Sequence, residues 1–138
     1  MTPGRVTPDW AKLEAPSLAE FEAIARLAFD ALPDEFRARA GEVPIVIADF
    51  PEDEVVSSMG AESPFDLMGL FEGIGLPQAG ESRTGQMPNR IWLYRRPILD
   101  YWAEHEETLG AIITHVLIHE IGHHFGFSDE DMEDIENR

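Results

Sequence analysis

The sequence predicts one domain that combines helices with a few short strands. Its 138 residues fit a single domain of ordinary size. Hydrophobic residues make up 43% of the chain, which is enough to form a core. Apolar residues recur at helical spacing in some stretches and as short β-branched runs in others. We expect residues 1–16, which hold three prolines, to be an irregular N-terminal segment and residues 17–138 to form the domain.

The first half of the domain is expected to contain two helices, a strand and a further helical segment. A capping-box pattern at Ser17 and Glu20 opens a helix with one apolar stripe. Pro33 begins a short second helix that ends near Ala40. Residues 44–48 are short, apolar and rich in β-branched residues, which is typical of a buried strand. One or two helical turns are expected over 52–59.

The second half begins with a short strand near 68–72 and a long glycine-rich loop. The next segment, NRIWLYRR (89–96), has the aromatic and β-branched content of a strand. Prolines flank it on both sides, which favours an edge position in the sheet. Three helical segments are expected to complete the chain: 97–102, 106–125 and a final acidic helix capped by Ser128.

The composition narrows the classes of partner and metal site. The formal net charge of −17 disfavours nucleic acid and anionic membranes as partners and favours basic ones, although acidity also serves solubility. The chain has no cysteine, so a metal ion would have to be bound by His, Asp or Glu. No stretch has the length of a membrane span and the N-terminus has no apolar run, so we expect a cytoplasmic protein.

The most informative residues are His119, Glu120 and His123, which form an HExxH pattern. On a helix the two histidines lie about 40° apart on one face, and Glu120 lies about 100° from His119. Histidines also gather near helix C-termini for reasons unrelated to metals. This helix, however, is apolar nearly all round, and burying these groups without a partner would be costly. The pattern therefore favours a zinc site with Glu120 as general base.

Asp129 is the first candidate for the third metal ligand. Gly126 lies three residues after His123, where a left-handed turn would carry the chain back towards the metal. Two histidines, one aspartate and a water make an acceptable open zinc site. Asp129 also fits the first turn of a capped helix without any metal. Other residues remain open as the third ligand: Glu130, Glu133, Asp100, Glu104 and His115.

The segment HEIGHHFGFSD (119–129) resembles the signature of the small bacterial zincin-like metallopeptidases, a family first catalogued as a domain of unknown function. LMGLFEGIGL (67–76) and MPNRIWLYRRPIL (87–99) are similar to other recurrent stretches of that family, so the resemblance covers about residues 17–135. It implies an α+β fold, namely a minimal zincin-like single domain with a small mixed sheet packed on a central active-site helix.

The resemblance also implies a function and a site. It implies zinc ligands at His119, His123 and Asp129, and a general base at Glu120, in an enzyme that hydrolyses peptide bonds. The predicted strand over 89–96 could pair with an extended peptide or protein substrate by β-addition. Candidate residues for binding the substrate or its oxyanion are Tyr94, Arg95, Arg96 and His124.

An alternative function comes from the small size of the domain, because few residues remain to build both walls of a substrate cleft. The protein would then be a metal-stabilised module that binds a protein partner. In an intermediate case it would be a peptidase that needs a partner to complete its cleft.

Overall fold

A computed structural model describes residues 9–73 and 89–137 of the chain. Its sheet has three strands, in the order β1 (Ile45–Ala48), β3 (Arg90–Tyr94) and β2 (Gly69–Glu72). β1 runs parallel to β3, whereas β2 runs antiparallel to it. The sheet is therefore mixed, and together with the helices it confirms the predicted α+β fold class.

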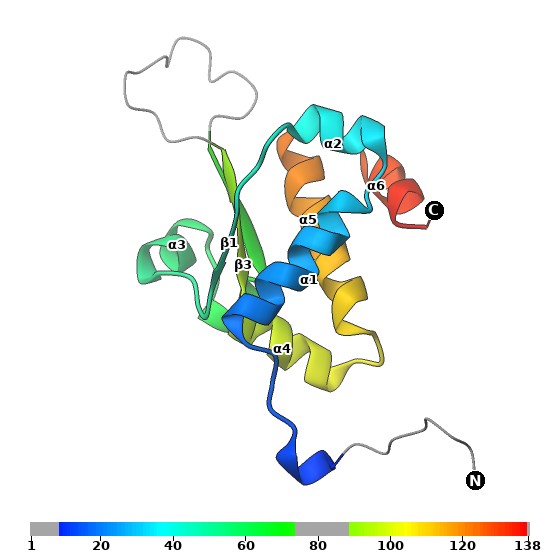
Figure 1. The fold of residues 1–138 in the computed structure, drawn as a ribbon. Helices are drawn as coiled ribbons and strands as arrows, with labels where there is room; N and C mark the ends of the chain where they lie inside the picture. The colour runs from blue at the N-terminus through cyan, green and yellow to red at the C-terminus, as the bar shows by residue number, and fades with distance from the viewer. Residues whose placement is uncertain (1–8, 74–88, 138) are drawn as a thin grey trace, which may run out of the picture.

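The other described elements are helical. The α-helices are α1 (Leu18–Asp30), α2 (Asp34–Ala40), α3 (Asp53–Ser58), α4 (Arg95–Glu104), α5 (Leu109–His124) and α6 (Asp129–Glu136), and two short 3₁₀ helices are η1 (Trp10–Lys12) and η2 (Pro64–Asp66). Figure 1 shows α1 and α5 on one side of the sheet and α3 on the other. The core lies on the side of α1 and α5, where α1 packs against both α5 and β1.

The first helix begins where the sequence predicts. The Ser17 hydroxyl accepts the Glu20 backbone N–H at 3.1 Å, and the Glu20 carboxylate accepts the Ser17 N–H at 2.8 Å. This reciprocal capping box satisfies two donors that a helix start would otherwise leave unpaired. The apolar stripe of α1 then buries Phe21, Ala25 and Phe29.

α5 is the central helix of the domain. Its buried residues surround it nearly completely: Leu109, Ile112, Ile113, Val116, Leu117, Ile118, Ile121 and Gly122. It begins slightly later than predicted, because the Thr108 hydroxyl accepts the Ala111 N–H at 3.1 Å and so caps the helix there.

The predicted edge position of the 89–96 segment is wrong. β3 pairs with β1 on one side and β2 on the other, so it is the central strand. The reason is that the strand ends at Tyr94 and α4 begins at Arg95. Pro97 therefore lies in the first turn of a helix, where its missing N–H removes no ladder hydrogen bond.

Within the described residues, the free edges of the sheet belong to β1 and β2. The Tyr94 N–H donates to the Met68 carbonyl at 3.0 Å. Because antiparallel ladders alternate, the backbone N–H and C=O groups of Gly69 and Phe71 then point away from β3. β2 also packs against α5, and a Cβ added at Gly69 would lie 2.6 Å from Val116 Cγ1. A glycine at position 69 thus permits the close approach of this free edge to α5.

The predicted turn after α5 is confirmed. Gly126 has a φ of 79°, in the left-handed region that favours glycine. Its N–H donates to the His123 carbonyl at 3.2 Å, and the Phe127 N–H donates to the Gly122 carbonyl at 2.9 Å, which together form a Schellman motif. The Ser128 hydroxyl then caps α6 by accepting the Asp131 N–H at 3.0 Å. This turn brings α6 back against α5.

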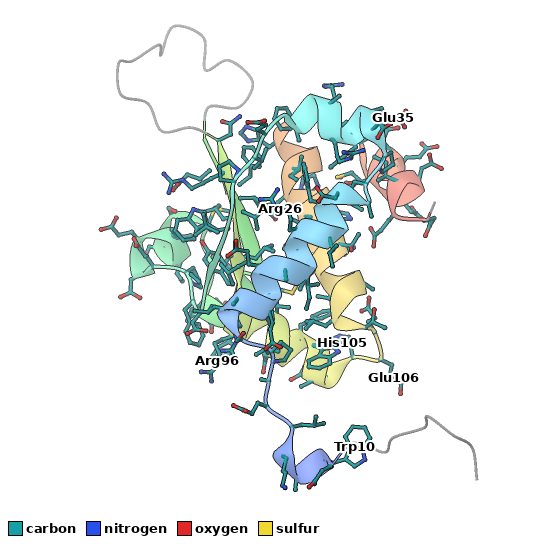
Figure 2. The ribbon with its side chains drawn as sticks, viewed as in Figure 1. Trp10, Arg26, Glu35, Arg96, His105 and Glu106 are labelled. Carbon is teal, nitrogen blue, oxygen red and sulfur yellow. The ribbon has the colours of Figure 1, made fainter. Side chains whose placement is uncertain are left out.

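The segment before α1 contains η1 and otherwise no regular structure over residues 9–16. Trp10 is 71% exposed and lies away from the sheet and the main helices (Figure 2). Residues 1–8 and most of the predicted glycine-rich loop lie outside the described residues. Among the helices of residues 9–73 and 89–137, none is both long and apolar enough to cross a membrane.

Candidate metal centre

One face of α5 carries three histidines on successive turns: His115, His119 and His123. α6 lies close to α5, because position 122 is a glycine. A Cβ added to Gly122 would lie 2.4 Å from the Met132 sulfur and 2.8 Å from Met132 Cγ. The close contact positions the acidic residues of α6 beside the histidine face.

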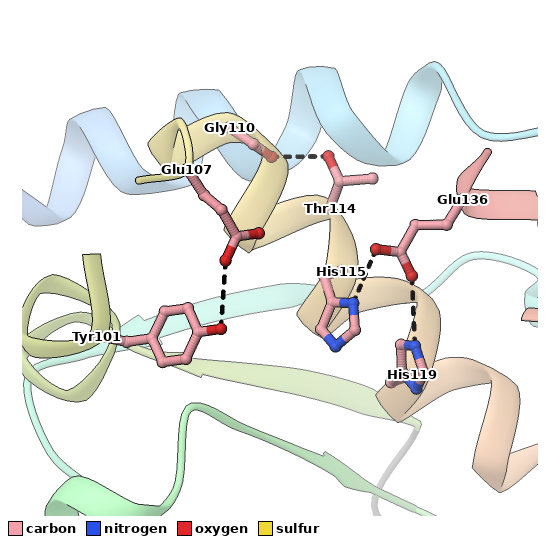
Figure 3. A network of polar contacts seen from close by, with 7 residues as sticks. All are labelled: Tyr101, Glu107, Gly110, Thr114, His115, His119 and Glu136. Carbon is pink, nitrogen blue, oxygen red and sulfur yellow. Dashed lines mark hydrogen bonds and ion pairs between the residues drawn. The ribbon is translucent and has the colours of Figure 1, made fainter. Parts of the chain in front are cut away.

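Two carboxylates of α6 reach these histidines, as Figure 3 shows for Glu136. Glu136 Oε2 lies 2.8 Å from His115 Nδ1, and Glu136 Oε1 lies 3.3 Å from His119 Nε2. At the other end of α6, Asp129 Oδ1 lies 3.6 Å from His123 Nε2. The α5–α6 pair therefore presents three imidazoles and two carboxylates along one seam.

The arrangement brings the predicted metal ligands together only in part. His123 and Asp129 face each other, but the His119 ring centre lies 4.1 Å from that of His115 and 5.7 Å from that of His123. Within residues 9–73 and 89–137, the group whose ligand atoms all lie within 4.8 Å of one another is His115, His119 and Glu136. In this structure His119 is thus turned towards Glu136 and not towards His123.

The donors fit a divalent metal ion. Imidazole nitrogen and carboxylate oxygen are usual ligands of zinc, at about 2.0–2.1 Å, which in a tetrahedral site places ligand atoms roughly 3.3 Å from one another. The His119–Glu136 separation of 3.3 Å and the His123–Asp129 separation of 3.6 Å are close to that value. Each of these two pairs therefore has the chemistry and the spacing of two ligands of one zinc ion.

Glu120 lies between α5 and the free edge of β2. Burial raises the pKa of its carboxyl group, while the Phe71 backbone N–H and the charge of His123 act in the opposite direction. The Glu120 side chain also passes near Gly69, since Glu120 Cγ would lie 3.4 Å from a Cβ added there. A carboxyl group whose pKa is raised towards neutrality is suited to act as a general base.

A cleft of about 220 Å³ opens beside these residues. One wall comes from α5, and the other from the segment that leads into β2; its lining residues are Asp66, Leu67, Met68, Gly69, His115, Val116, His119 and Glu120. The cleft gives solvent and small groups access to the Glu120 carboxyl and the His119 imidazole.

The predicted substrate-binding residues lie in three different places. His124 stacks on Phe71, with ring centres 3.8 Å apart, and so lies at the free edge of β2. Arg95 donates to the Pro16 carbonyl at 2.6 Å and pairs with Asp49 at 3.1 Å, which ties the segment before α1 to the end of β1. These contacts give the Arg95 guanidinium a structural role.

Tyr94 belongs to a different surface. It is 3% exposed, and burial together with the negative charges of Glu72, Glu52 and Glu120 raises its pKa to about 12. It lines a second pocket, of about 470 Å³, whose walls are Ala48, Phe50, Glu52, Val55, Leu70, Glu72, Arg90, Trp92 and Tyr94.

Arg96, the remaining candidate, lies over the Phe50 ring at 5.5 Å. It is labelled in Figure 2 near the start of α4.

Glu136 is a candidate site residue that the sequence did not reveal. In the described part of the chain it is the acid that joins the histidine cluster, whereas Asp100, Glu104, Glu130 and Glu133 do not. Glu136 lies seven residues after Asp129, which is two helical turns, and the buried Met132 lies on the same side between them. The helical period of α6 was the signal that could have indicated it.

A profile of the zincin-like metallopeptidase family matches residues 40–138, which include the whole sheet and α3 to α6. The match begins at the end of α2, so the part of the expected resemblance over residues 17–39 lies outside it. No curated protein matches the chain at a significant level. The profile covers well over half of the sequence, and it includes the HExxH helix and the acidic helix packed against it. The chain therefore belongs to the zincin-like metallopeptidase family.

Proposed function

We propose that the protein is a zinc-dependent peptidase that hydrolyses peptide bonds in extended segments of a peptide or protein substrate. The observation that carries this proposal is the position of Glu120. Its carboxyl group lies beside the histidines of α5 and is close enough to the free edge of β2 to accept the Phe71 N–H. A general base, a metal-binding face and a strand edge thus meet in one place.

His119, His123 and Asp129 are the residues we propose as zinc ligands, and their donor atoms suit that ion. When bound, zinc would lower the pKa of a coordinated water and polarise a substrate carbonyl. His123 and Asp129 already face each other across the α5–α6 turn, and His119 lies one helical turn away from His123. To complete this set, His119 would turn its imidazole from Glu136 towards His123.

Glu120 would act as the proton carrier. Its carboxylate would accept a proton from the attacking water and later donate it to the nitrogen of the departing amine. Burial raises the pKa of the Glu120 carboxyl, and a higher pKa strengthens a base that still has to be ionised at working pH. The Phe71 N–H supports the ionised form and keeps the carboxylate near the cleft.

The substrate would bind along the free edge of β2. The outward backbone groups of Gly69 and the Phe71 carbonyl can pair with an extended peptide, which would then add a strand to the sheet, while the Phe71 N–H stays with Glu120. This position replaces the predicted pairing with the 89–96 strand, because β3 already has a partner on each side. A peptide at this edge would lie beside Glu120. A peptide cannot pair with β3, because β3 has no free edge.

Side chains of such a peptide would alternate between the two faces of the sheet. On the face opposite α5, they would meet the 470 Å³ pocket beside β2. Its walls include Tyr94, Trp92, Glu52 and Glu72. Arg90 also lines the pocket, where it pairs with Glu72 at 3.2 Å and lies over the Trp92 ring at 5.9 Å. Of these groups, the Glu52 carboxylate is the one we propose to attract a basic side chain of the substrate.

The test of this proposal is Glu120→Gln, assayed for turnover of a broad mixture of peptides and for bound zinc by elemental analysis. We expect the variant to keep zinc and to lose at least about 100-fold in turnover, the usual contribution of a general base. Glu22→Gln, an exposed position on α1, is the matched control and should behave as the parent protein. Undiminished turnover in Glu120→Gln would contradict the role of Glu120.

A second candidate function rests on the small size of the cleft beside Glu120, about 220 Å³. Ligand pockets of proteins are usually larger, at about 300–1,000 Å³. The chain would then bind zinc, show no turnover alone, and recognise or need a protein partner that supplies the missing wall. Saturable proteolysis by the purified chain would exclude this candidate.

A further inference from the structure

The cluster of His115, His119 and Glu136 is separate from the proposed set of zinc ligands, although it shares one histidine with it. One carboxylate bridges the two imidazoles, at 2.8 Å to His115 Nδ1 and 3.3 Å to His119 Nε2 (Figure 3). All three ligand atoms lie within 4.8 Å of one another. The proposed zinc set of His119, His123 and Asp129 is not gathered in this way within the described residues.

The chemistry of this cluster is that of a metal site. Two imidazoles and a carboxylate are a ligand set that zinc and other divalent transition metals accept. The side chains of His115 and Glu136 are 46% and 30% exposed, so an ion can reach them from solvent. His115 and His119 also border the cleft, which leaves room for a water as a further ligand.

We propose that His115, His119 and Glu136 form a second position for a divalent transition-metal ion, and that this outer position and the inner position at His119, His123 and Asp129 exclude each other. The inner position rests on the proposed function, whereas the outer one rests on the observed contacts of Glu136. The exclusion follows from His119, whose imidazole belongs to both sets.

The two positions require different orientations of His119. Its Nε2 faces Glu136 at 3.3 Å, and its ring lies nearer to His115 than to His123. An ion at the outer position would hold the imidazole there and leave the inner position with two protein ligands. An ion at the inner position would draw His119 away from Glu136. The wild-type chain therefore binds one ion at a time, and the ratio of the two affinities sets the fraction of the protein that carries its ion at the outer position.

The direct experiment removes the inner position and titrates the protein with Co²⁺ alone, monitored by calorimetry and by the visible absorption of bound cobalt. His123→Asn and Asp129→Asn are combined in one variant; both side chains are well exposed, at 59% and 93%, so the fold should persist. We expect this double variant to bind one Co²⁺ per chain. A folded double variant that binds no Co²⁺ overturns the outer position.

Further substitutions in the double variant identify the outer ligands. Adding Glu136→Gln or His115→Asn should weaken Co²⁺ binding at least about tenfold, since each change removes one of three protein ligands. Asp131→Asn, an exposed acid of the same helix, is the control and should leave the affinity unchanged. Equal affinities with and without Glu136 would show that the ion binds elsewhere and would overturn the assignment.

The stoichiometry of the wild-type chain tests the exclusion itself. One Co²⁺ per chain at saturation is expected, whereas two would show that the positions fill independently. These metal titrations do not depend on turnover. If Glu120→Gln keeps full turnover, the proposed role of Glu120 is wrong but the cobalt results still stand. If the double variant binds no Co²⁺, the outer position is wrong but the proposed peptidase activity is unaffected.

Discussion

Burial raises the pKa of two side chains that lie on opposite sides of the sheet, Glu120 and Tyr94. The consequences of the raised pKa differ, because Glu120 carries a carboxyl group and Tyr94 a phenol. For Glu120, a raised pKa makes the carboxylate a stronger base. For Tyr94, a pKa of about 12 keeps the phenol neutral throughout the working range of the protein, so its effect appears only in the stability of the fold at alkaline pH.

The stability of the protein should therefore decrease between pH 10 and pH 12. In the unfolded chain Tyr94 ionises near pH 10, whereas in the folded chain it ionises near 12. The stabilising contribution is present below pH 10 and is lost as the pH rises through this window. Between pH 8 and pH 11, the free energy of unfolding should fall by about 1 kcal/mol less in Tyr94→Phe than in the parent protein. Urea unfolding at the two pH values measures this difference. Equal losses in the two proteins would contradict the shift.

Asp129→Asn tests the third ligand of the inner position when it is introduced into the Glu136→Gln variant, in which the outer position is weakened. The substitution removes the carboxylate that faces His123 at 3.6 Å and should lower zinc affinity at least about tenfold, measured by competition with a chelator. Asp131→Asn provides the control on the same helix. Zinc binding that is equally strong with and without Asp129 in this Glu136→Gln background would show that Asp129 is not a ligand.

The sequence predicted correctly that three candidate site residues share one helix, because that depends on local spacing. His119, Glu120 and His123 lie on one helix, so the helical period alone relates them to one another. Glu136 could not be found in the same way, because its contact with His119 spans 17 residues and depends on how α6 packs against α5. That packing is decided by Gly122 and Met132, which carry no metal-binding group.

At the scale of elements, the contact between α5 and α6 positions both carboxylates. Gly122→Ala should disturb it, since the new Cβ would lie 2.4 Å from Met132 Sδ and 2.8 Å from Met132 Cγ. We expect a loss of about 1–3 kcal/mol in the free energy of unfolding, and weaker zinc binding because Asp129 and Glu136 both move with α6. Thermal unfolding and zinc titration measure the two effects.

Gly110→Ala is the matched control for this prediction. Gly110 lies on the same helix, but a Cβ added there has nothing within 4 Å. That change should leave zinc binding unchanged and raise stability by about 0.4–1 kcal/mol, as alanine restricts the unfolded chain more than glycine does. A Gly122→Ala variant as stable as Gly110→Ala would show that α6 adapts without loss.

The sheet shows why the position of a strand is harder to predict than its existence. The aromatic and β-branched residues of 89–96 predicted a strand correctly, and β3 spans Arg90–Tyr94. Its central position depends on β1 and β2, which come from distant parts of the chain. Pro97 suggested an edge because the boundary between β3 and α4 was placed two residues too late.

At the scale of the whole molecule, the core extends beyond the residues that match the family. α1 lies outside the matched range, yet it packs against α5 and β1 and buries Phe21 and Phe29. This packing supports the proposal that the domain begins near residue 17. α5, which carries the histidines, thus packs against α1 on one side and against the sheet and α6 on its other sides.

The net charge of −17 bears on the choice of substrate, because an acidic molecule attracts basic chains over distances comparable to the Debye length. If basic side chains also enter the pocket beside β2, Glu52→Gln should lower kcat/KM for peptides that contain Arg or Lys by about tenfold and leave neutral peptides unaffected. Glu54→Gln, an exposed position on α3 outside that pocket, is the control.

Ionic strength separates the two effects. Long-range attraction weakens for every basic peptide between low and high salt, in the parent and in both variants. Glu52 is exposed, but a direct contact acts over a shorter distance than the Debye length of about 10 Å at 0.1 M salt, so the difference between the parent and Glu52→Gln should persist at that salt concentration. A difference that disappears with salt would assign the preference for basic substrates to the overall charge of the domain and not to the pocket. A preference for neutral peptides at all salt concentrations would contradict both explanations.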